Sequence, residues 1–287
     1  MPIAYRSIFR PDLFAGQTIL VTGGGTGIGR AVAHELASLG AHVVLAARTL
    51  ENLERVRAEI RDAGGAASYF VCNIREEEQV AALFDFVLAE RGGLHGLVNN
   101  AGGQFISPAE MISLKGWRAV VETNLTGTFL MCREAFNRHM NDHGGAIVNM
   151  LIEMWRGFPG MAHSAAARAG IENLTKTLAV EWARAGVRVN AVAPGLISSS
   201  GLERYPEAVR PMIAQNIRDI PMKRMGTEAE VSAAIVFLLS PTAAFISGES
   251  IKIDGAGSLW RKTWEVGEHG NAPEAFNGFN EEKAPDQ

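Results

Sequence analysis

The sequence predicts an α/β protein with a parallel, doubly wound sheet, and three observations lead to this fold class. Strand-like runs alternate with helical segments from Thr18 to Ile253. These runs are apolar along their whole length, as in strands that helices cover on both faces. The chain has no internal repeat or interdomain linker, and 287 residues with 47% hydrophobic content can bury one large core. We therefore expect one domain over residues 1–287, with its core at about 14–258.

The first half of the chain predicts four strands and three helices. Thr18–Thr22 (TILVT) is a buried strand, and the helix after it, Gly29–Gly40, ends at a glycine, a common helix terminator. Leu50–Ala63 combines charged residues with an apolar stripe, which predicts an amphipathic helix. The same alternation predicts strands at His42–Ala47, Ser68–Cys72 and Leu94–Asn99, and a helix at Glu76–Arg91.

The second half continues the pattern and then departs from it. Leu114–Asn141 and Ala162–Ala185 are long helical stretches; Ile171, Leu174, Leu178 and Trp182 form one stripe of the second. The remaining expected elements are the strands Ala146–Leu151, Val187–Val192 and Ser250–Ile253 and the helix Glu228–Leu239. Residues 194–221 are irregular and should form a mobile substrate-side loop or short helices. Residues 261–287 are polar and should form a C-terminal tail on the surface or on a neighbouring subunit.

Charge and composition exclude several classes of protein. Lys and Arg number 27 against 31 Asp and Glu, so the chain offers no basic field for nucleic acid and no cationic face for a membrane. No apolar run reaches the roughly 20 residues of a membrane span, and Met1–Phe14 lacks the apolar core of a signal peptide. Cys72 and Cys132 lie in apolar stretches, so we expect no disulfide and a cytoplasmic location. No metal site is expected.

A glycine-rich turn between the first strand and the first helix predicts a dinucleotide site. It contains Thr22, Gly23, Gly25, Thr26, Gly27, Ile28 and Gly29. Gly23 permits the tight turn, Gly27 lets the backbone approach a pyrophosphate, and Gly29 lets the helix pack closely on the strand. The helix N-terminus would face the phosphates with free N–H groups and partial positive charge. We therefore expect a single-domain Rossmann-like fold.

The end of the second strand favours NADP(H) as the cofactor. An acidic residue there would bind the ribose hydroxyls of NAD and repel the additional phosphate of NADP. This chain has Ala47, Arg48 and Thr49 and no acid. Arg48 can pair with the 2′-phosphate through charge-assisted hydrogen bonds.

These residues resemble the short-chain dehydrogenase/reductase family over about residues 14–258. The shared motifs are the glycine turn, Asn99-Asn100-Ala101-Gly102, Asn124, and Pro194-Gly195-Leu196-Ile197. The resemblance implies a homotetramer or homodimer formed through the two long helices. It also implies that Asn73 and Ile74 lie near the adenine, that Asn100, Ala101 and Gly102 line the cofactor cleft, and that residues 194–199, including Pro194, Gly195, Ile197 and Ser199, hold the nicotinamide carboxamide.

The catalytic motif departs from the family pattern. Typical members carry a serine after the fifth strand and then Tyr-x3-Lys, whereas the fifth strand here has no serine. Ser164 stands at the tyrosine position and Arg168 at the lysine position. The chain has only three tyrosines, Tyr5, Tyr69 and Tyr205, and none is near this helix in sequence. Carbonyl reduction has therefore lost its usual proton donor.

The departures resemble a narrower group within the family. The loop Gly103–Glu110, the segments Lys115–Trp117 and Glu122–Phe129 and the helix start His163–Gly170 are similar to those of peroxisomal trans-2-enoyl-CoA reductases. The related 2,4-dienoyl-CoA reductases also lack the usual tyrosine at this place. The resemblance implies NADPH-dependent reduction of the double bond of an acyl-CoA. In that chemistry a thioester oxygen gathers negative charge as an enolate, and preorganised donors can stabilise it. This demands less of a dedicated tyrosine.

The candidate catalytic residues are Asn124, His163, Ser164 and Arg168. Arg168 is expected to anchor the ribose and nicotinamide, with Asn124 holding a water or a backbone group near it. His163 and Ser164 could donate to the enolate oxygen, or could cap and pack the helix. Further candidates are Glu153 as a proton relay or an exposed loop carboxylate, Tyr205 as an acid, Trp155 and Phe158 as an acyl pocket, and Arg204, Arg210, Lys223 and Arg224 as partners of CoA phosphates or as scattered surface charge.

Three functions remain open from the sequence. The first is an NADPH-dependent enoyl-CoA reductase that takes an acyl-CoA as its small-molecule substrate. The second is an alcohol, aldehyde or ketone dehydrogenase of the same family acting on a hydrophobic substrate. The third is a catalytically silent NADP-binding protein. The chain has no peroxisomal C-terminal tripeptide that we recognise, which also favours a cytoplasmic role.

Overall fold

The computed structural model describes residues 3–199, 207, 210–260, 264 and 266–279, and its centre is a parallel sheet of seven strands. The strand order is β3-β2-β1-β4-β5-β6-β9, and every pairing is parallel. The order reverses direction between β1 and β4, which makes this position the topological switch point where such sheets bind ligands. The strands are β1 (Thr18–Thr22), β2 (His42–Ala47), β3 (Ala66–Val71), β4 (Gly96–Asn99), β5 (Gly145–Met150), β6 (Val187–Pro194) and β9 (Ser250–Ile253).

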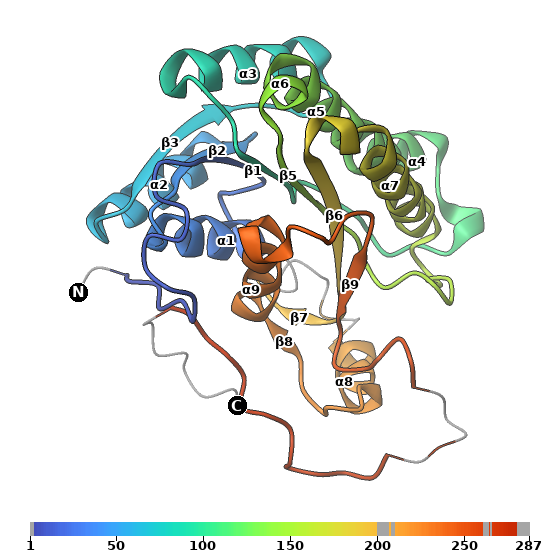
Figure 1. The fold of residues 1–287 in the computed structure, drawn as a ribbon. Coiled ribbons are helices and arrows are strands. Elements are labelled where there is room, and N and C mark those ends of the chain that lie inside the picture. The colour runs from blue at the N-terminus through green and yellow to red at the C-terminus, as the bar shows by residue number, and fades with distance from the viewer. Residues whose placement is uncertain (1–2, 200–206, 208–209, 261–263, 265, 280–287) are drawn as a thin grey trace.

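Helices cover both faces of the sheet, as the continuous apolar strands predict (Figure 1). One layer contains α1 (Gly27–Ser38), α2 (Leu50–Asp62) and α9 (Glu228–Leu239), with α1 and α9 packed side by side. The other contains α3 (Glu77–Arg91), α5 (Gly127–Ala135) and α7 (Ala162–Glu181). Each layer encloses its own hydrophobic cluster against the sheet. The doubly wound α/β fold is thus confirmed.

The long helical stretch expected from Leu114 is one run of helix that is interrupted by two π-helical turns. It consists of α4 (Leu114–Val121), the π-helical turn η2 (Glu122–Thr126), α5, a second π-helical turn η3 (Phe136–Met140) and the short α6 (Asn141–His143). π-Helical turns are rare and occur frequently at functional sites. The first of them carries Asn124, one of the residues singled out in the sequence.

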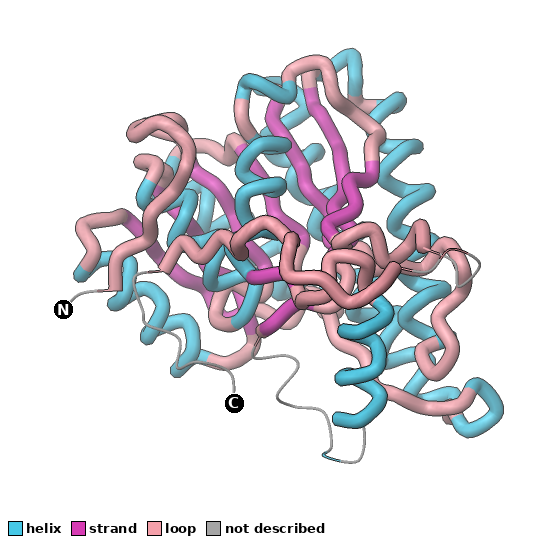
Figure 2. Tube along the Cα trace, turned by 90° about the horizontal axis from the view of Figure 1, so that it is seen from below, coloured by secondary structure: helices cyan, strands magenta, loops and turns pink. Residues whose placement is uncertain are grey.

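The region 194–221 contains regular structure within its described residues. A two-residue strand, β7 (Ile197–Ser198), pairs with β8 (Gly226–Thr227), and α8 (Arg210–Asp219) lies between them in sequence. Other short elements are the 3-10 turns η1 (Ala109–Met111), η4 (Ala183–Ala185) and η7 (Pro241–Ala243). Seen from below, in Figure 2, loops gather across the near side of the strands beside α8.

Residues 266–279, which follow β9 in the chain, run along the lower side of the molecule in Figure 1 and reach the N-terminal segment. The ring of Phe279 lies 5.0 Å from that of Tyr5, and the Arg6 amide donates to the Gly278 carbonyl at 2.6 Å. Phe279 also contacts α1, because Arg30 lies over its ring at 4.6 Å. We call residues 266–279 the C-terminal strap, since they join the N-terminal segment to the region around β8.

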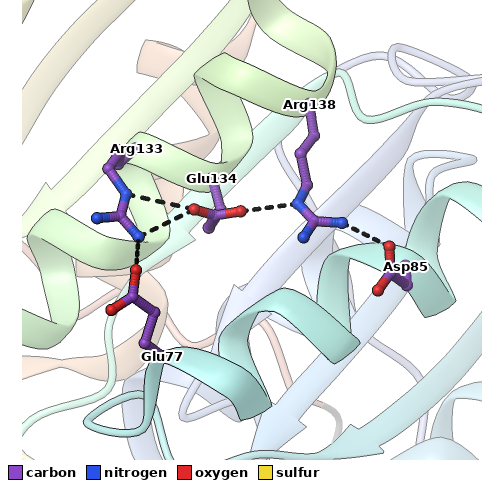
Figure 3. Close-up of polar contacts among 5 residues, drawn as sticks. All are labelled: Glu77, Asp85, Arg133, Glu134 and Arg138. Carbon is purple, nitrogen blue, oxygen red and sulfur yellow. Dashed lines mark hydrogen bonds and ion pairs between the residues drawn. The ribbon is translucent and has the colours of Figure 1, made fainter.

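A ladder of ion pairs joins α3 to α5 and η3 (Figure 3). Arg133 pairs with Glu77 of α3 and with Glu134. Arg138 bridges Glu134 at 2.7 Å and Asp85 of α3 at 2.5 Å. Because these groups are partly exposed, each pair contributes little alone, but the network fixes the two helices relative to one another. No helix in the described part of the chain is both long and apolar enough to cross a membrane.

Candidate functional site

The glycine turn between β1 and α1 is built so tightly that side chains cannot enter it. Gly23 and Gly27 have φ of 67° and 59°, in the left-handed region that favours glycine. A methyl group on Gly29 would lie 2.2 Å from the Gly23 carbonyl oxygen, and one on Gly25 would lie 2.9 Å from Asn52 Cβ. The turn therefore presents bare backbone and the start of α1 at the switch point, where a dinucleotide pyrophosphate can bind.

The ends of β1 and β4 are joined by a set of hydrogen bonds around Thr22. Its hydroxyl accepts from the amides of Asn100 and Ala101, both at 3.0 Å, and donates to the Val98 carbonyl at 3.2 Å. The side-chain amide of Asn100 donates to the Thr22 and Gly23 carbonyls at 3.0 and 3.3 Å. The turn after β1 and the loop after β4 are consequently held together by these bonds.

The residues expected at the adenine end lie after β2 and β3. Arg48 is exposed, and no hydrogen bond or ion pair joins it to another residue of the described chain. Ile74 is buried and packs against Gly127 of α5 so closely that a methyl group on this glycine would lie 2.8 Å from the Ile74 side chain. Asn73 donates locally, from its backbone amide to Gln79 and from its side-chain amide to Glu76.

The loop after β6 is fixed against the loop after β9. The Gly195 amide donates to the Ile253 carbonyl at 2.9 Å, and a methyl group on Gly195 would lie 2.8 Å from Asp254 Cβ. Pro194 and Ile197 are buried, whereas Gly195 and Ser199 are half-buried. This segment, expected at the nicotinamide end, thus lies at the carboxyl edge of the sheet, with its backbone pressed against the neighbouring loop.

Arg168 joins three elements at the centre of the candidate site. Its Nη2 donates to Asn124 Oδ1 at 2.8 Å, and its Nη1 donates to the carbonyl of Met150 at the end of β5. Asn124 in turn accepts from the Gly103 amide at 3.1 Å and donates to the Gly103 carbonyl at 2.8 Å. A methyl group on Gly102 would lie 2.3 Å from Arg168 Nη2. The structure therefore brings together the expected residues Gly102, Asn124 and Arg168.

The guanidinium of Arg168 is a buried positive charge whose described partners are all neutral. The residue is 5% exposed, and its Nε has no hydrogen-bond partner among the described residues. Burial lowers the pKa of Arg168 to about 10, so the group stays protonated at neutral pH. A buried cation without a carboxylate partner is costly. Such a charge suits a site where a ligand brings hydroxyl groups or developing negative charge.

His163 and Ser164 lie at the start of α7 and are both buried. The Ser164 hydroxyl donates to Gln104 Oε1 at 2.8 Å, and the Ser164 amide donates to His163 Nδ1 at 2.8 Å. His163 Nδ1 is therefore an acceptor, which leaves the proton of the neutral ring on Nε2. Nε2 has no partner among the described residues, and the ring packs edge-on against Phe105 at 4.3 Å.

The described tyrosines lie away from this site. Tyr5 donates to Glu35 of α1, and Tyr69 of β3 donates to Glu54 of α2. The other expected candidates differ in their surroundings: Trp155 is partly exposed and donates to Glu172, Phe158 is half-buried, Arg210 is exposed, Lys223 donates to the Arg218 carbonyl, and Arg224 is held by Glu230. Because Glu230 already neutralises Arg224, this arginine is less available to a CoA phosphate. Arg204 and Tyr205 lie outside the described residues.

A buried chain of polar side chains links β4, β5 and α7, and sequence reasoning identified only one of its members, Asn99. The Asn99 side chain donates to Asn149 Oδ1 at 2.9 Å, and Asn149 donates to Thr175 Oγ1 at 2.9 Å. Thr175 closes the chain by donating to the Ile171 carbonyl at 2.8 Å. These side chains link β4, β5 and α7. Their polar character within apolar runs was the signal that could have identified them.

Comparisons with known proteins agree with this geometry. The family model described as "Enoyl-(Acyl carrier protein) reductase" matches residues 23–257. The Bacillus subtilis protein described as "Probable 2,4-dienoyl-CoA reductase" is 40% identical over 244 residues, which cover 83% of this chain and 95% of that protein.

Two solved structures extend the comparison. The citronellol catabolism dehydrogenase (AtuB) of Pseudomonas aeruginosa PAO1 is 58% identical, with a TM-score of 0.81, and the match covers 89% of this chain and 100% of that one. A structure from Beutenbergia cavernae, described as a "putative NAD(P) dependent gluconate 5-dehydrogenase" with bound NADP at low occupancy, is 36% identical, with a TM-score of 0.80, and the match covers 86% of this chain and 99% of that one.

The sheet order, the glycine turn at the switch point and the buried cation beside it define a dinucleotide-dependent oxidoreductase of the α/β class. Within that class, the chain belongs to the short-chain dehydrogenase/reductase family, whose members use nicotinamide cofactors.

Proposed function

We propose that this protein is an NADPH-dependent reductase that saturates the 2,3 double bond of a trans-2-enoyl-CoA thioester. The observation that carries the proposal is the buried, protonated Arg168, bound to Asn124 and Met150, at the position where typical family members have a lysine. Tyr5 and Tyr69 are engaged elsewhere and do not assist it. A site with a fixed positive charge and no nearby tyrosine among the described residues suits a reaction that builds negative charge on a thioester oxygen.

The cofactor in this proposal is NADP(H). Arg48 supports it, because an exposed guanidinium without a partner in the described chain can bind a 2′-phosphate. The bare backbone at Gly23, Gly25 and Gly29 fits a pyrophosphate, which would also contact Thr26, Gly27 and Ile28. Residues 194–199 would receive the nicotinamide carboxamide. When bound, NADPH supplies the hydride.

The roles of the remaining residues follow from charge and hydrogen bonding. Arg168 would hold the ribose and favour the enolate through its charge, and Asn124 would keep the guanidinium in position. Ser164 and His163 would line the acyl side, where the His163 Nε2 proton has no partner among the described residues and is available to an oxyanion. Arg210, Trp155 and Phe158 remain candidates for the CoA and acyl contacts.

Exposed apolar side chains support a homotetramer or homodimer formed through the long helices. Trp117 of α4 is 39% exposed, Phe129 of α5 is 41% exposed and Val180 of α7 is 78% exposed. These are the helices that the family resemblance assigns to subunit contacts. Large apolar groups exposed on helix surfaces are found at interfaces between subunits.

A second candidate is an alcohol or aldehyde dehydrogenase acting on a hydrophobic substrate. The 58% identity to a protein described as a citronellol catabolism dehydrogenase favours it. This reaction needs an acid to protonate an alkoxide, and its substrate would occupy the same cleft.

The test compares three substrates with purified protein: a medium-chain trans-2-enoyl-CoA, a matched ketone and a matched aldehyde. NADPH oxidation is followed by absorbance, and NADPH and NADH binding by fluorescence. Turnover of the thioester alone supports the reductase. Turnover of the carbonyl compounds alone favours the dehydrogenase, and binding without any turnover favours a silent NADP-binding protein.

A further inference from the structure

The proposed reduction needs one proton that the groups around Arg168 do not supply. Hydride addition to C3 of the enoyl group leaves C2 as part of an enolate, which must gain a proton to complete the reaction. Arg168 is protonated throughout the neutral range, because its pKa is about 10. The hydroxyl of Ser164 is engaged by Gln104 at 2.8 Å and is a weak acid. Neither group is therefore suited to protonate C2, and the Nε2 proton of His163 is assigned above to the enolate oxygen, which leaves a carboxyl group at the same end of the strands as the candidate acid.

Glu153 lies on the loop that follows β5, at the carboxyl edge of the sheet, where the candidate site also lies. Three neighbouring strands, β5, β6 and β9, end there at Met150, Pro194 and Ile253. Met150 is the residue whose carbonyl binds Arg168, and Glu153 follows it by three positions. Asp254, the residue after β9, contacts the backbone of Gly195. The topology thus brings the loop of Glu153 beside both the cation and the segment expected at the nicotinamide end.

The carboxyl group of Glu153 has surroundings unlike those of a surface carboxylate. It is half-buried, and no hydrogen bond or ion pair joins it to another described residue. Burial and the negative charge of Asp254 both raise its pKa. Asp254 itself is fixed, since its two oxygens accept from the amides of Ala256 and Ser258, each at 3.0 Å.

Two basic groups oppose this effect, and both are directed elsewhere. Arg156 and Lys252 lower the pKa of Glu153 by a smaller amount than burial and Asp254 raise it. The guanidinium of Arg156 donates to the carbonyls of Leu259 and Trp260, and the Lys252 ammonium lies over the Trp155 ring at 4.3 Å. Glu153 therefore retains a proton to a higher pH than an ordinary glutamate does.

We propose that Glu153 is the general acid of the reaction and gives its proton to C2 of the reduced acyl group. This inference rests on the proposed function. The hydride forms the new C–H bond at C3, and the C2–C3 π electrons move into the enolate. The O–H bond of Glu153 then breaks as a C–H bond forms at C2, and the carboxylate takes a new proton from water. One hydride and one proton are added, and NADPH is oxidised to NADP⁺.

The experiment measures kcat for the trans-2-enoyl-CoA from about pH 5 to about pH 9, with the wild-type protein, Glu153→Gln and Glu249→Gln. Glu249 is exposed and precedes β9 at the opposite edge of the sheet, so its variant is the matched control. We expect Glu153→Gln to lower kcat roughly 100-fold with NADPH binding unchanged, and to remove the fall of activity at high pH. The control keeps both the rate and the pH profile of the wild type.

The outcomes separate the two proposals. A wild-type protein that binds NADPH but does not reduce the thioester contradicts the proposed function. A wild-type protein that reduces it while Glu153→Gln retains kcat within about twofold, with an unchanged alkaline fall, overturns the role of Glu153. A merely structural role would alter thermal stability or NADPH affinity without changing the shape of the pH profile, and that result also overturns it.

Discussion

At the scale of single residues, the site is organised around a cation that lacks a carboxylate. Arg168 donates to one side-chain oxygen, of Asn124, and to one backbone oxygen, of Met150. Neutral acceptors offset only part of the free energy that is lost when the charge leaves water. The two hydrogen bonds of the guanidinium join the end of β5 to the π-helical turn, and this connection is what the buried charge contributes to the fold. The remaining hydrogen-bonding capacity of the cation is available to a bound ligand.

Replacement of Arg168 tests this arrangement directly. We expect Arg168→Ala to lower kcat for the preferred substrate by about 100-fold to 1,000-fold, the range found when one preorganised donor is removed. The kcat of Arg168→Lys should lie between those of the wild type and Arg168→Ala, since a single ammonium lacks the planar pair of donors that reaches both acceptors. Steady-state kinetics give the rates, and thermal melts show whether each variant is folded. An unchanged kcat in a folded Arg168→Ala protein would contradict the role of this cation.

Arg48 is expected to determine cofactor preference. Arg48→Ala should raise the Kd for NADPH roughly 10-fold to 100-fold, the effect of losing a hydrogen bond between charged groups, while the Kd for NADH changes little. Arg61, which is exposed in the last turn of α2, provides the control variant Arg61→Ala. Fluorescence titration measures both constants. Equal changes for the two cofactors would refute the assignment.

At the scale of secondary-structure elements, α1 carries one carboxylate and binds another, and the pKa values of the two are shifted in opposite directions. Its own Glu35 is buried and accepts hydrogen bonds from Tyr5, Ser7 and Ser232. Burial raises the pKa of Glu35. Glu59 of α2 pairs with His34 and Arg30 of α1; burial alone would raise its pKa, but these partners lower it to about 2.

These two sites predict opposite effects of pH on stability. The contribution of Glu59 is complete above the ordinary glutamate pKa and is lost as pH falls toward about 2. The contribution of Glu35 is present at low pH and declines as pH rises above the ordinary value, because the native state binds its proton more tightly. Relative to the wild type, Glu59→Gln should therefore lose most stability at neutral pH, whereas any loss from Glu35→Gln should be largest at low pH. Urea unfolding of the three proteins across the pH range measures this; parallel curves would disprove it.

The helices and strands were largely predictable from the sequence, because the periodicity of apolar residues and the glycines that end helices determine them. Continuous apolar runs marked the strands, and Gly40 marked the end of the first helical region. The π-helical turn at Glu122–Thr126 was not predictable, since the winding depends on how Asn124 reaches Val120 and Gly103. The bounds of α8 could not be placed either, because its polar composition resembles that of a loop.

The residues of the candidate site could be predicted only where they belong to sequence motifs of the family. The proximity of Asn124 to Arg168 followed from the family resemblance and agrees with a distance of 2.8 Å. The interaction of Glu153 with Asp254 could not be predicted, because the two residues follow strands that are separated by about 100 positions and meet only through the sheet order. The bonding of Asn99 to Asn149 depends on the same tertiary pairing.

At the scale of the whole molecule, the C-terminal strap connects regions that are distant in sequence. His269 contacts the Pro221 carbonyl at 2.9 Å, Arg224 donates to the Pro273 carbonyl at 3.2 Å, and Thr227 donates to the Phe276 carbonyl at 2.5 Å. The strap then reaches Tyr5 through Phe279. The segment 221–227, which follows α8, is thus braced against the N-terminal residues.

A pair of glycine substitutions tests whether the strap contributes to stability. A methyl group on Gly278 would lie 2.1 Å from the Tyr5 ring, whereas one on Gly270 would meet nothing within 4 Å. We expect Gly278→Ala to cost about 1–3 kcal/mol through overpacking and to make the strap more sensitive to limited proteolysis. Gly270→Ala should match the wild type. Equal melting temperatures and equal cleavage rates for the two variants would show that the strap is energetically neutral.

The packing of α1 against α9 also orders events during synthesis. The glycine turn and α1 leave the ribosome long before Glu228–Leu239, the helix that packs beside them, has been translated. Until then, apolar side chains of α1 such as Val32 and Leu36 lack part of their partner surface and are a source of aggregation. A nascent chain interrupted before α9 therefore holds the complete glycine motif without the helix that packs beside α1.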